Sequence, residues 1–391
     1  MRMQLSRALS LFTLLGLAAK GQVAQAQSYV KLNELLYDEG RPGITVKETE
    51  VEAVVEFENQ DKFNLLYVHD SMTGASPNGV VSSTTTVTGA SAGAAGSGQL
   101  ARGQNLTTFK DTRNAYNVGY TLQAGRLLAL TGTYVYSKET DYLSQGGQLG
   151  FKLELNQKNT TLNGTARQTN DTISPTLPHA VEQKKRTAEY ALSATQLLAP
   201  WALVNFGYTY GTNQGYLTEP YKKIMVGTAQ YHEARPDSRL TQSVSAGIKV
   251  KPLDFAAVDL QYRYYWDDWK ISSNTTQLRL LGEISESWLT AVTFRNYEQT
   301  GAYFWANSLP DAAGPPKYRS ADVRLSPYKS QTLALSATYK LSESWSFDGM
   351  VAKYAQWVPQ GEEEGGSVGL FNDNKAMLHA IVASLAAKYT F

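Results

Sequence analysis

The sequence of 391 residues contains no cysteine and only four histidines. Without cysteine, the chain has no disulfide framework and no site for an N-terminal lipid anchor of the lipoprotein type. No apolar run after residue 26 approaches the roughly 20 residues that a transmembrane helix needs. If this chain spans a membrane, it therefore has to do so as a closed barrel.

The chain also has no large excess of charge of either sign, because its 36 Lys and Arg residues are nearly balanced by 35 Asp and Glu residues. A nucleic-acid-binding domain would need a strongly basic balance, so we expect no nucleic-acid partner. Amphipathic aromatic residues are abundant instead, with 24 Tyr and 7 Trp against 12 Phe. Tyr and Trp collect where side chains meet both lipid and water, and their excess favours a membrane protein.

Groups for catalysis or metal binding are scarce. His69 adjoins Asp70 and Ser71, but neighbouring strand residues point to opposite faces, which is poor geometry for a catalytic triad. His232 and nearby acidic residues form only a weak metal pattern, and there is no glycine-rich nucleotide loop. We predict no catalytic residue, no metal site and no cofactor, and a hydrolase site at a barrel rim is the least favoured function.

The N-terminal region has the pattern of a secretory signal peptide. Arg2 and Arg7 precede an apolar run over 8–19, and Ala24-Gln25-Ala26 forms a small-x-small cleavage site. We therefore predict a signal peptide at 1–26 and a single exported domain at 27–391.

The exported region alternates apolar and polar residues in segments of about ten, which predicts strands with one face in lipid and one in a lumen. Short turns are expected at 58–61, 124–126, 156–159, 198–200, 251–254, 285–287 and 342–344, and longer loops at 73–113, 171–183, 213–237, 301–327 and 358–375. Predicted lipid-facing residues are Val204, Phe206, Leu260, Leu278 and Leu335, and predicted lumen residues are Asn205, Gln261, Gln277 and Ser336.

These patterns predict an all-β, antiparallel, up-and-down transmembrane barrel of about 16 strands, within a range of 14–18. Its short turns would be periplasmic and its long loops extracellular, in the lipid of the outer membrane of a Gram-negative bacterium. The final strand alternates up to Tyr389 and Phe391, and this ending resembles the signal read by the bacterial barrel-assembly machinery. We expect that strand to close the barrel, because an unpaired edge in lipid is costly.

Several internal motifs also resemble one family of bacterial outer-membrane barrels, known only as a domain of unknown function. The motifs are DSMTGASPNG (70–79), FKDTR (109–113), SKETDYLS (137–144), GYLTEPYK (215–222), RPDSR (235–239) and YRYYWDDW (262–269). The resemblance implies an exported single-chain barrel and implies no activity. The Gly, Ala, Ser and Thr-rich stretch at 80–104 departs from the family pattern.

The candidate site is a network of charged residues in the lumen and at its rim. Asp259, Arg263 and Asp267 share one strand face, and we expect them to form either an ion-paired wall or a charged constriction. The RPDSR motif precedes a strand, so its charged residues should lie at the outer rim. Its arginines would pair with rim carboxylates such as Asp267 and Asp268, or they would capture an anion. The motif residues concerned are Arg235, Asp237 and Arg239, and Asp70 should face the lumen from another strand.

The loop at 73–113 is long enough to fold inward as a plug or to extend outside the barrel. The favoured function is a channel or transport pore for small polar solutes. The alternative is a structural barrel that houses or contacts another exported component, such as a redox protein or an unidentified periplasmic or surface partner. An open, watery bore would favour the channel, and a packed bore would favour the scaffold.

Overall fold

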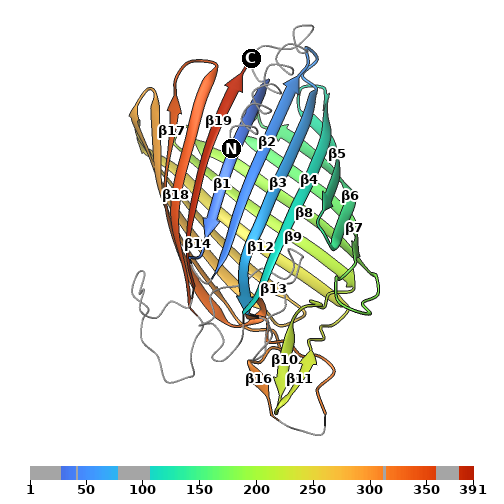
Figure 1. Cartoon of the computed structure of the whole chain (residues 1–391). Coiled ribbons are helices and arrows are strands. Elements are labelled where there is room, and N and C mark those ends of the chain that lie inside the picture. The colour runs from blue at the N-terminus through green and yellow to red at the C-terminus, as the bar shows by residue number, and fades with distance from the viewer. Residues whose placement is uncertain (1–27, 41–42, 78–105, 311–313, 358–377) are drawn as a thin grey trace, which may run out of the picture.

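A computed structural model describes residues 28–40, 43–77, 106–310, 314–357 and 378–391, which form one closed antiparallel barrel (Figure 1). The predicted signal peptide at 1–26 and the stretch at 80–104 lie outside the described residues. The barrel strands are β1 (Tyr29–Asp38), β2 (Ile44–Glu56), β3 (Lys62–Pro77), β4 (Leu106–Ala124), β5 (Leu128–Lys138), β6 (Tyr142–Leu155), β7 (Thr160–Ile173), β8 (Gln183–Ala199), β9 (Ala202–Gly215), β12 (Ser238–Leu253), β13 (Ala256–Asp267), β14 (Ser272–Ser285), β15 (Trp288–Gln299), β17 (Tyr328–Lys340), β18 (Trp345–Trp357) and β19 (Leu378–Thr390).

The predicted count of 16 strands is confirmed, and the last strand closes the barrel on the first. β1 and β19 pair without interruption from Tyr29 opposite Thr390 to Asp38 opposite Ile381. Short connections at 57–61, 125–127, 156–159, 200–201, 254–255, 286–287 and 341–344 lie at one end of the barrel, as predicted. We call this the turn end and the opposite one the loop end; Figure 1 shows the turn end at the top.

The predicted lipid and lumen faces are also confirmed. Phe206 and Leu335 leave 59% and 54% of their surface exposed, within an apolar band on the outer wall. The neighbouring residues point inward, where the side chains of Asn205 and Gln261 hydrogen-bond to each other. Aromatic pairs such as Trp345 with Tyr389, 4.9 Å apart between ring centroids, border the apolar band at the turn end.

The loop predicted at 73–113 is too long by several residues on each side. β3 continues to Pro77 and β4 begins at Leu106, and the two pair throughout this extension. The Gly, Ala, Ser and Pro residues at 74–77 have low strand propensity. The ladder with β4 nevertheless keeps them extended, since alternate residues of an antiparallel pair exchange backbone hydrogen bonds.

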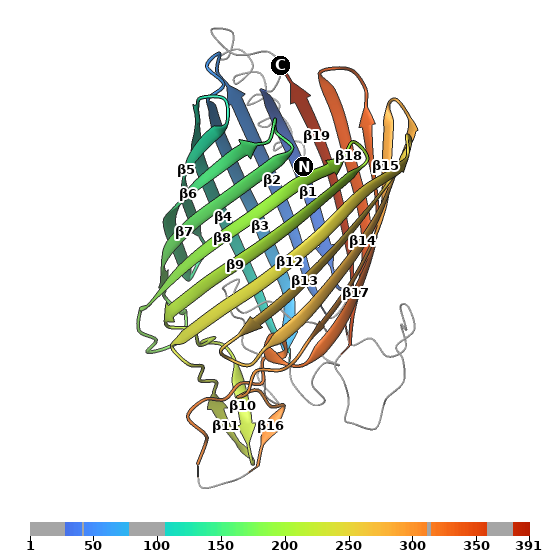
Figure 2. The ribbon, with the colours of Figure 1, turned by 180° about the vertical axis from the view of Figure 1, so that it is seen from behind.

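Two other predicted loops contain structure that short-range periodicity did not reveal. Between β9 and β12 lie β10 (Lys223–Val226) and β11 (Ala229–His232), and between β15 and β17 lie β16 (Ser308–Leu309) and the helical turn η2 (Val323–Leu325). β10 pairs with both β11 and β16 in a small sheet that projects beyond the loop end (Figures 1 and 2). Segments far apart in the chain therefore meet at this end.

The packed apolar core is concentrated at the loop end. One cluster joins Trp269, Ile271 and Phe304, and another joins Val323 of η2 to Leu378 of β19. The helices of the described residues include none that is long and apolar enough to cross a membrane.

Candidate functional site: a segment folded into the mouth of the barrel

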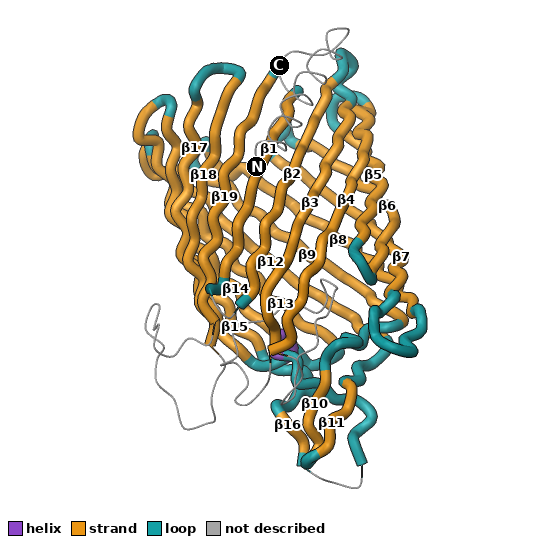
Figure 3. The backbone as a smooth tube through the Cα atoms, in the orientation of Figure 1, coloured by secondary structure: helices purple, strands orange, loops and turns teal. Residues whose placement is uncertain are grey.

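The connection between β15 and β17 folds into the mouth of the barrel at its loop end. Arg324, in η2, lines one cavity of about 210 Å³ together with Lys185 of β8 and Arg239 of β12. The same residue lines a second cavity of about 410 Å³ with Tyr37 of β1 and Tyr354 of β18. These strands lie on opposite sides of the ring, so only a segment inside the barrel can contact both. Figure 3 shows the helical turn in purple at this position.

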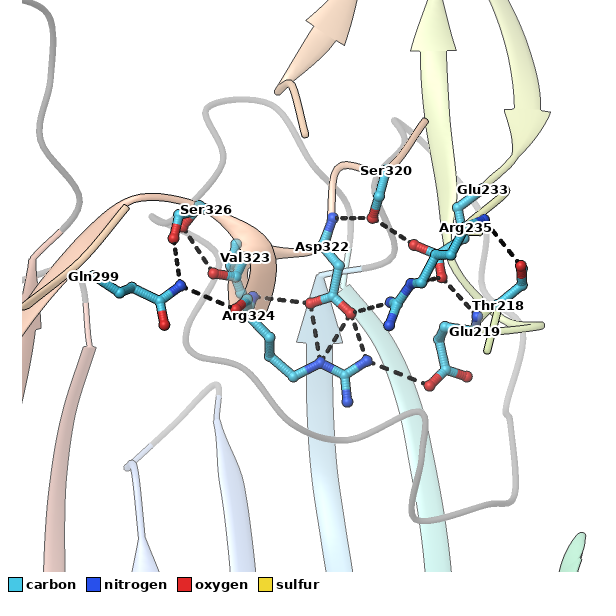
Figure 4. Close-up of polar contacts among 10 residues, drawn as sticks. All are labelled: Thr218, Glu219, Glu233, Arg235, Gln299, Ser320, Asp322, Val323, Arg324 and Ser326. Atoms are coloured by element: carbon cyan, nitrogen blue, oxygen red, sulfur yellow. Dashed lines mark hydrogen bonds and ion pairs between the residues drawn. The ribbon is translucent and has the colours of Figure 1, made fainter. Parts of the chain in front are cut away.

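A cluster of buried charges holds this segment in place (Figure 4). Asp322 is the N-cap of η2 and accepts a hydrogen bond from the backbone N–H of Arg324. Its fully buried carboxylate also pairs with Arg235 Nη2 at 2.8 Å and with Arg324 Nη2 at 2.5 Å. Arg235 pairs in turn with Glu233 at 2.7 Å, and Arg324 reaches Glu219 at 3.3 Å. The cluster therefore ties the β15–β17 connection to the β9–β12 connection.

The segment is also fixed to the barrel wall. Gln299, at the end of β15, donates a hydrogen bond of 2.6 Å to the backbone carbonyl of Ser326 and one of 3.2 Å to that of Arg324. The backbone N–H of Ala302 donates to the carbonyl of Leu325 at 2.8 Å. The two ends of the connection are thereby held beside each other, so the inward position is built into the local hydrogen bonding.

Burial sets the ionisation of the cluster. It raises the pKa of Glu219 to about 7, although Arg324, Arg235 and Lys222 act in the opposite direction. Burial would likewise raise the pKa of Asp322, but Arg324, Lys222 and Arg235 outweigh it and hold that pKa well below its ordinary value. Glu219 also has one buried carboxyl oxygen without a hydrogen-bond partner. The pKa of Glu219 therefore lies near neutral pH.

We expect the docked segment to loosen as the pH rises. A carboxyl whose folded pKa is raised binds its proton more tightly when folded, so stability falls between pH 4.5 and about 7 and is then constant. The cost of ionisation is on the order of 3 kcal/mol. The loss of stability is measured by hydrogen exchange of the Ala302 and Leu325 amides at pH 5.5 and at pH 8. After correction for intrinsic rates, both amides should exchange faster at pH 8.

The matched control for this pH effect is Glu219→Gln, which keeps the shape of the side chain and cannot ionise. Glu139, between β5 and β6, also has its pKa raised to about 7, by burial and then by Asp111. A pH dependence that persists unchanged in Glu219→Gln would contradict the assignment to Glu219 and point to a group such as Glu139.

The structure places Asp70 in the lumen, as expected, on the inner face of β3. Its carboxylate accepts a hydrogen bond of 2.7 Å from Arg113 Nε of β4, and Arg113 Nη2 lies 3.7 Å from Glu48 of β2. Asp70 is buried, with 6% of its surface exposed. It therefore belongs to an ion-paired part of the wall near the mouth.

The residues of the RPDSR motif do not act together. Arg239 pairs with Asp267 at 2.5 Å, as expected, and Asp267 also accepts a hydrogen bond from Tyr265. Arg235 does not pair with the rim carboxylates, because the chain turns it into the buried cluster with Asp322. Asp237 is exposed, and Asp268, also exposed, accepts a hydrogen bond from the backbone N–H of Leu240.

Asp259 and Arg263 both point into the lumen from β13 but do not form one network with Asp267. Asp259 accepts a hydrogen bond of 2.7 Å from Gln261, and its cross-strand neighbours are Lys249 and Arg279. Arg263 is exposed, and its guanidinium lies 5.5 Å from the ring centroid of Tyr265. Within the described part of the chain, Arg263 has no carboxylate within ion-pair distance.

Tyr389 and Phe391 lie at the turn end. Their rings stack with centroids 6.1 Å apart, and the Phe391 backbone N–H donates to the carbonyl of Ser28.

Among the described residues, no group of three or more His, Cys, Asp or Glu side chains is arranged to hold a metal ion. Sequence reasoning missed Glu219, Asp322 and Arg324, and it weighed Glu233 only as part of a weak metal pattern beside His232. The local signal for the cluster was the length of the two connections that carry it.

The fold is a closed, 16-stranded antiparallel barrel of the outer-membrane type, with a polar inner wall and a folded segment in its mouth. The chain belongs to the family described as protein of unknown function (DUF3570), whose model matches residues 7–385. This confirms the predicted membership of a family known only as a domain of unknown function. None of the curated proteins is detectably similar to the chain in sequence.

Solved outer-membrane barrels share this fold. A bacterial polysaccharide outer membrane secretin matches with a TM-score of 0.52 and 7% sequence identity, over 94% of this chain and 99% of that chain. CdiB from Acinetobacter baumannii matches with a TM-score of 0.51 and 10% identity, over 94% of this chain but 61% of that one. At such identities the likeness concerns the fold alone.

Proposed function

We propose that this protein is an outer-membrane channel for small polar solutes, with its turn end in the periplasm and its loop end outside the cell. The observation that supports this most directly is the exposure of charged residues on the inner wall. Arg167, Glu189, Arg263 and Arg295 are all exposed although they belong to the inward-facing set of their strands. A bore filled with side chains would bury such groups, so their exposure favours a water-filled lumen.

The test is single-channel recording with the purified, folded barrel in a planar lipid bilayer. A channel gives discrete current steps whose size scales with salt concentration. A barrel that is folded by gel migration and inserts into the bilayer, yet passes no ions, would refute the proposal. Such a result would favour the alternative function, a structural barrel that houses or contacts another exported component.

Arg263→Ala should shift the ion selectivity of this channel toward cations with little change in stability. The removed positive charge faces the lumen and has no ion pair to lose, so the local potential becomes more negative while Asp259 stays on the same face. The reversal potential under a salt gradient and the melting temperature are measured on the same preparation. Arg186→Ala is the matched control, since Arg186 lies on the outer face of β8. Equal reversal potentials in both variants would place Arg263 off the conduction path.

A further inference from the structure

The larger of the two cavities beside η2 has the size and lining of a small-molecule site. It measures about 410 Å³ and lies between the helical turn and the inner wall. Three tyrosines, Tyr37, Tyr328 and Tyr354, line it from β1, β17 and β18. Cavities of roughly 300–1,000 Å³ with mostly apolar and aromatic walls are typical of small-molecule sites, including those in barrel mouths.

The rest of the lining is mainly aliphatic. Val323 of η2 is buried against Leu378 of β19, and Val46 and Met72 contribute from β2 and β3. A methionine sulfur and tyrosine rings both pack favourably against an aromatic ring. The cavity walls therefore suit a flat ring better than a strongly hydrated solute.

The polar groups of the cavity indicate which ligand functions it would accept. Tyr37 donates its hydroxyl hydrogen to Glu39 Oε1 at 2.8 Å, and Tyr354 donates its own to Gln356 at 2.9 Å. Since these hydrogens are already committed and the Tyr354 oxygen also accepts from Ser330, the Tyr37 oxygen is the one left to accept from a ligand. A hydrogen-bond donor on the ligand is therefore favoured.

The charged groups of the lining are already engaged. Glu39 accepts from Tyr37 and, through Oε2, from the backbone N–H of Ile44. Arg324 is held by Asp322 and Glu219. A charged ligand would have to give up its hydration without gaining a counter-charge, which is costly. A neutral ligand carries no such cost.

We propose that this cavity binds a neutral, single-ring aromatic molecule that bears hydroxyl groups. The inference goes beyond ion conduction and does not depend on it, because binding can be measured on the folded barrel in detergent. The probe is resorcinol, titrated by saturation-transfer NMR with the signal of empty micelles subtracted. We expect saturable binding to the native barrel.

The decisive variant is Val382→Phe, which places a ring into the cavity from β19. It should weaken resorcinol binding about tenfold or more, because the added ring occupies the site. The matched control is Ser384→Phe, on the same inner face of β19 but outside the cavity lining, and it should bind as the native protein does. If Val382→Phe does not fold, as judged by heat-modifiable gel migration, Thr332→Phe fills the cavity from β17 instead.

Three results would overturn the proposal. The first is an absence of saturable resorcinol binding to the native barrel. The second is binding that is equal in the cavity-filled and control variants, which would place the probe elsewhere. The third is binding of 3-hydroxybenzoate as tight as that of resorcinol at pH 5.5, where the segment stays docked, because an ionised carboxylate should bind about tenfold more weakly where it finds no counter-charge.

Discussion

Asp322→Ala should release the β15–β17 connection from the mouth of the barrel while leaving the strand ladder intact. The change removes the carboxylate that Arg235 and Arg324 share, and with it the N-cap of η2. Breaking a buried ion pair by removing one partner typically costs about 3–5 kcal/mol, because the remaining charge is left uncompensated. The amides of Ala302 and Leu325 should then exchange with solvent faster by a factor that reflects this cost.

The control for this change is Asp237→Ala, which removes an exposed carboxylate from the neighbouring connection. Its exchange rates should match those of the native protein. Single-channel current offers a second measurement, since a segment that leaves the mouth should raise the conductance. Unchanged exchange in Asp322→Ala would mean that the apolar contacts of Val323 and Leu325 hold the segment without the ion pairs.

Leu335→Arg should destabilise the barrel by about 2–4 kcal/mol, because it puts a charge on the lipid-facing wall near the middle of β17. Ser336→Arg, one residue further along the same strand, should have a much smaller effect because its side chain points into the lumen. Equilibrium unfolding in lipid vesicles with urea measures both free energies. Equal losses in the two variants would mean that both faces of β17 are buried alike, as in a water-soluble sandwich.

The first of these predictions concerns the mouth of the barrel and the second concerns its wall. The structure of the wall could be predicted from the sequence much better than that of the mouth. The facing of Leu335 and Ser336 follows from alternation over a few residues, and the structure confirms it. The pairing of Arg239 with Asp267 could also be predicted from the sequence, because their strands are consecutive in the barrel. The pairing of Arg235 was predicted wrongly, since its partner Asp322 lies in a connection that no local pattern placed near it.

Strand number, the facing of each side chain and closure by the last strand were determined by the sequence itself, because alternation with a period of two residues is a local property. The segment in the mouth was decided only by the tertiary structure. Arg235 and Asp322 are 87 residues apart in the chain, and Glu219 and Arg324 are 105 apart. The strands that accompany them, such as β10 with four residues and β16 with two, are too short for periodicity to reveal. Their charges become partners only once the closed barrel has brought the two connections to the same end, where burial makes an unpaired charge too costly to keep.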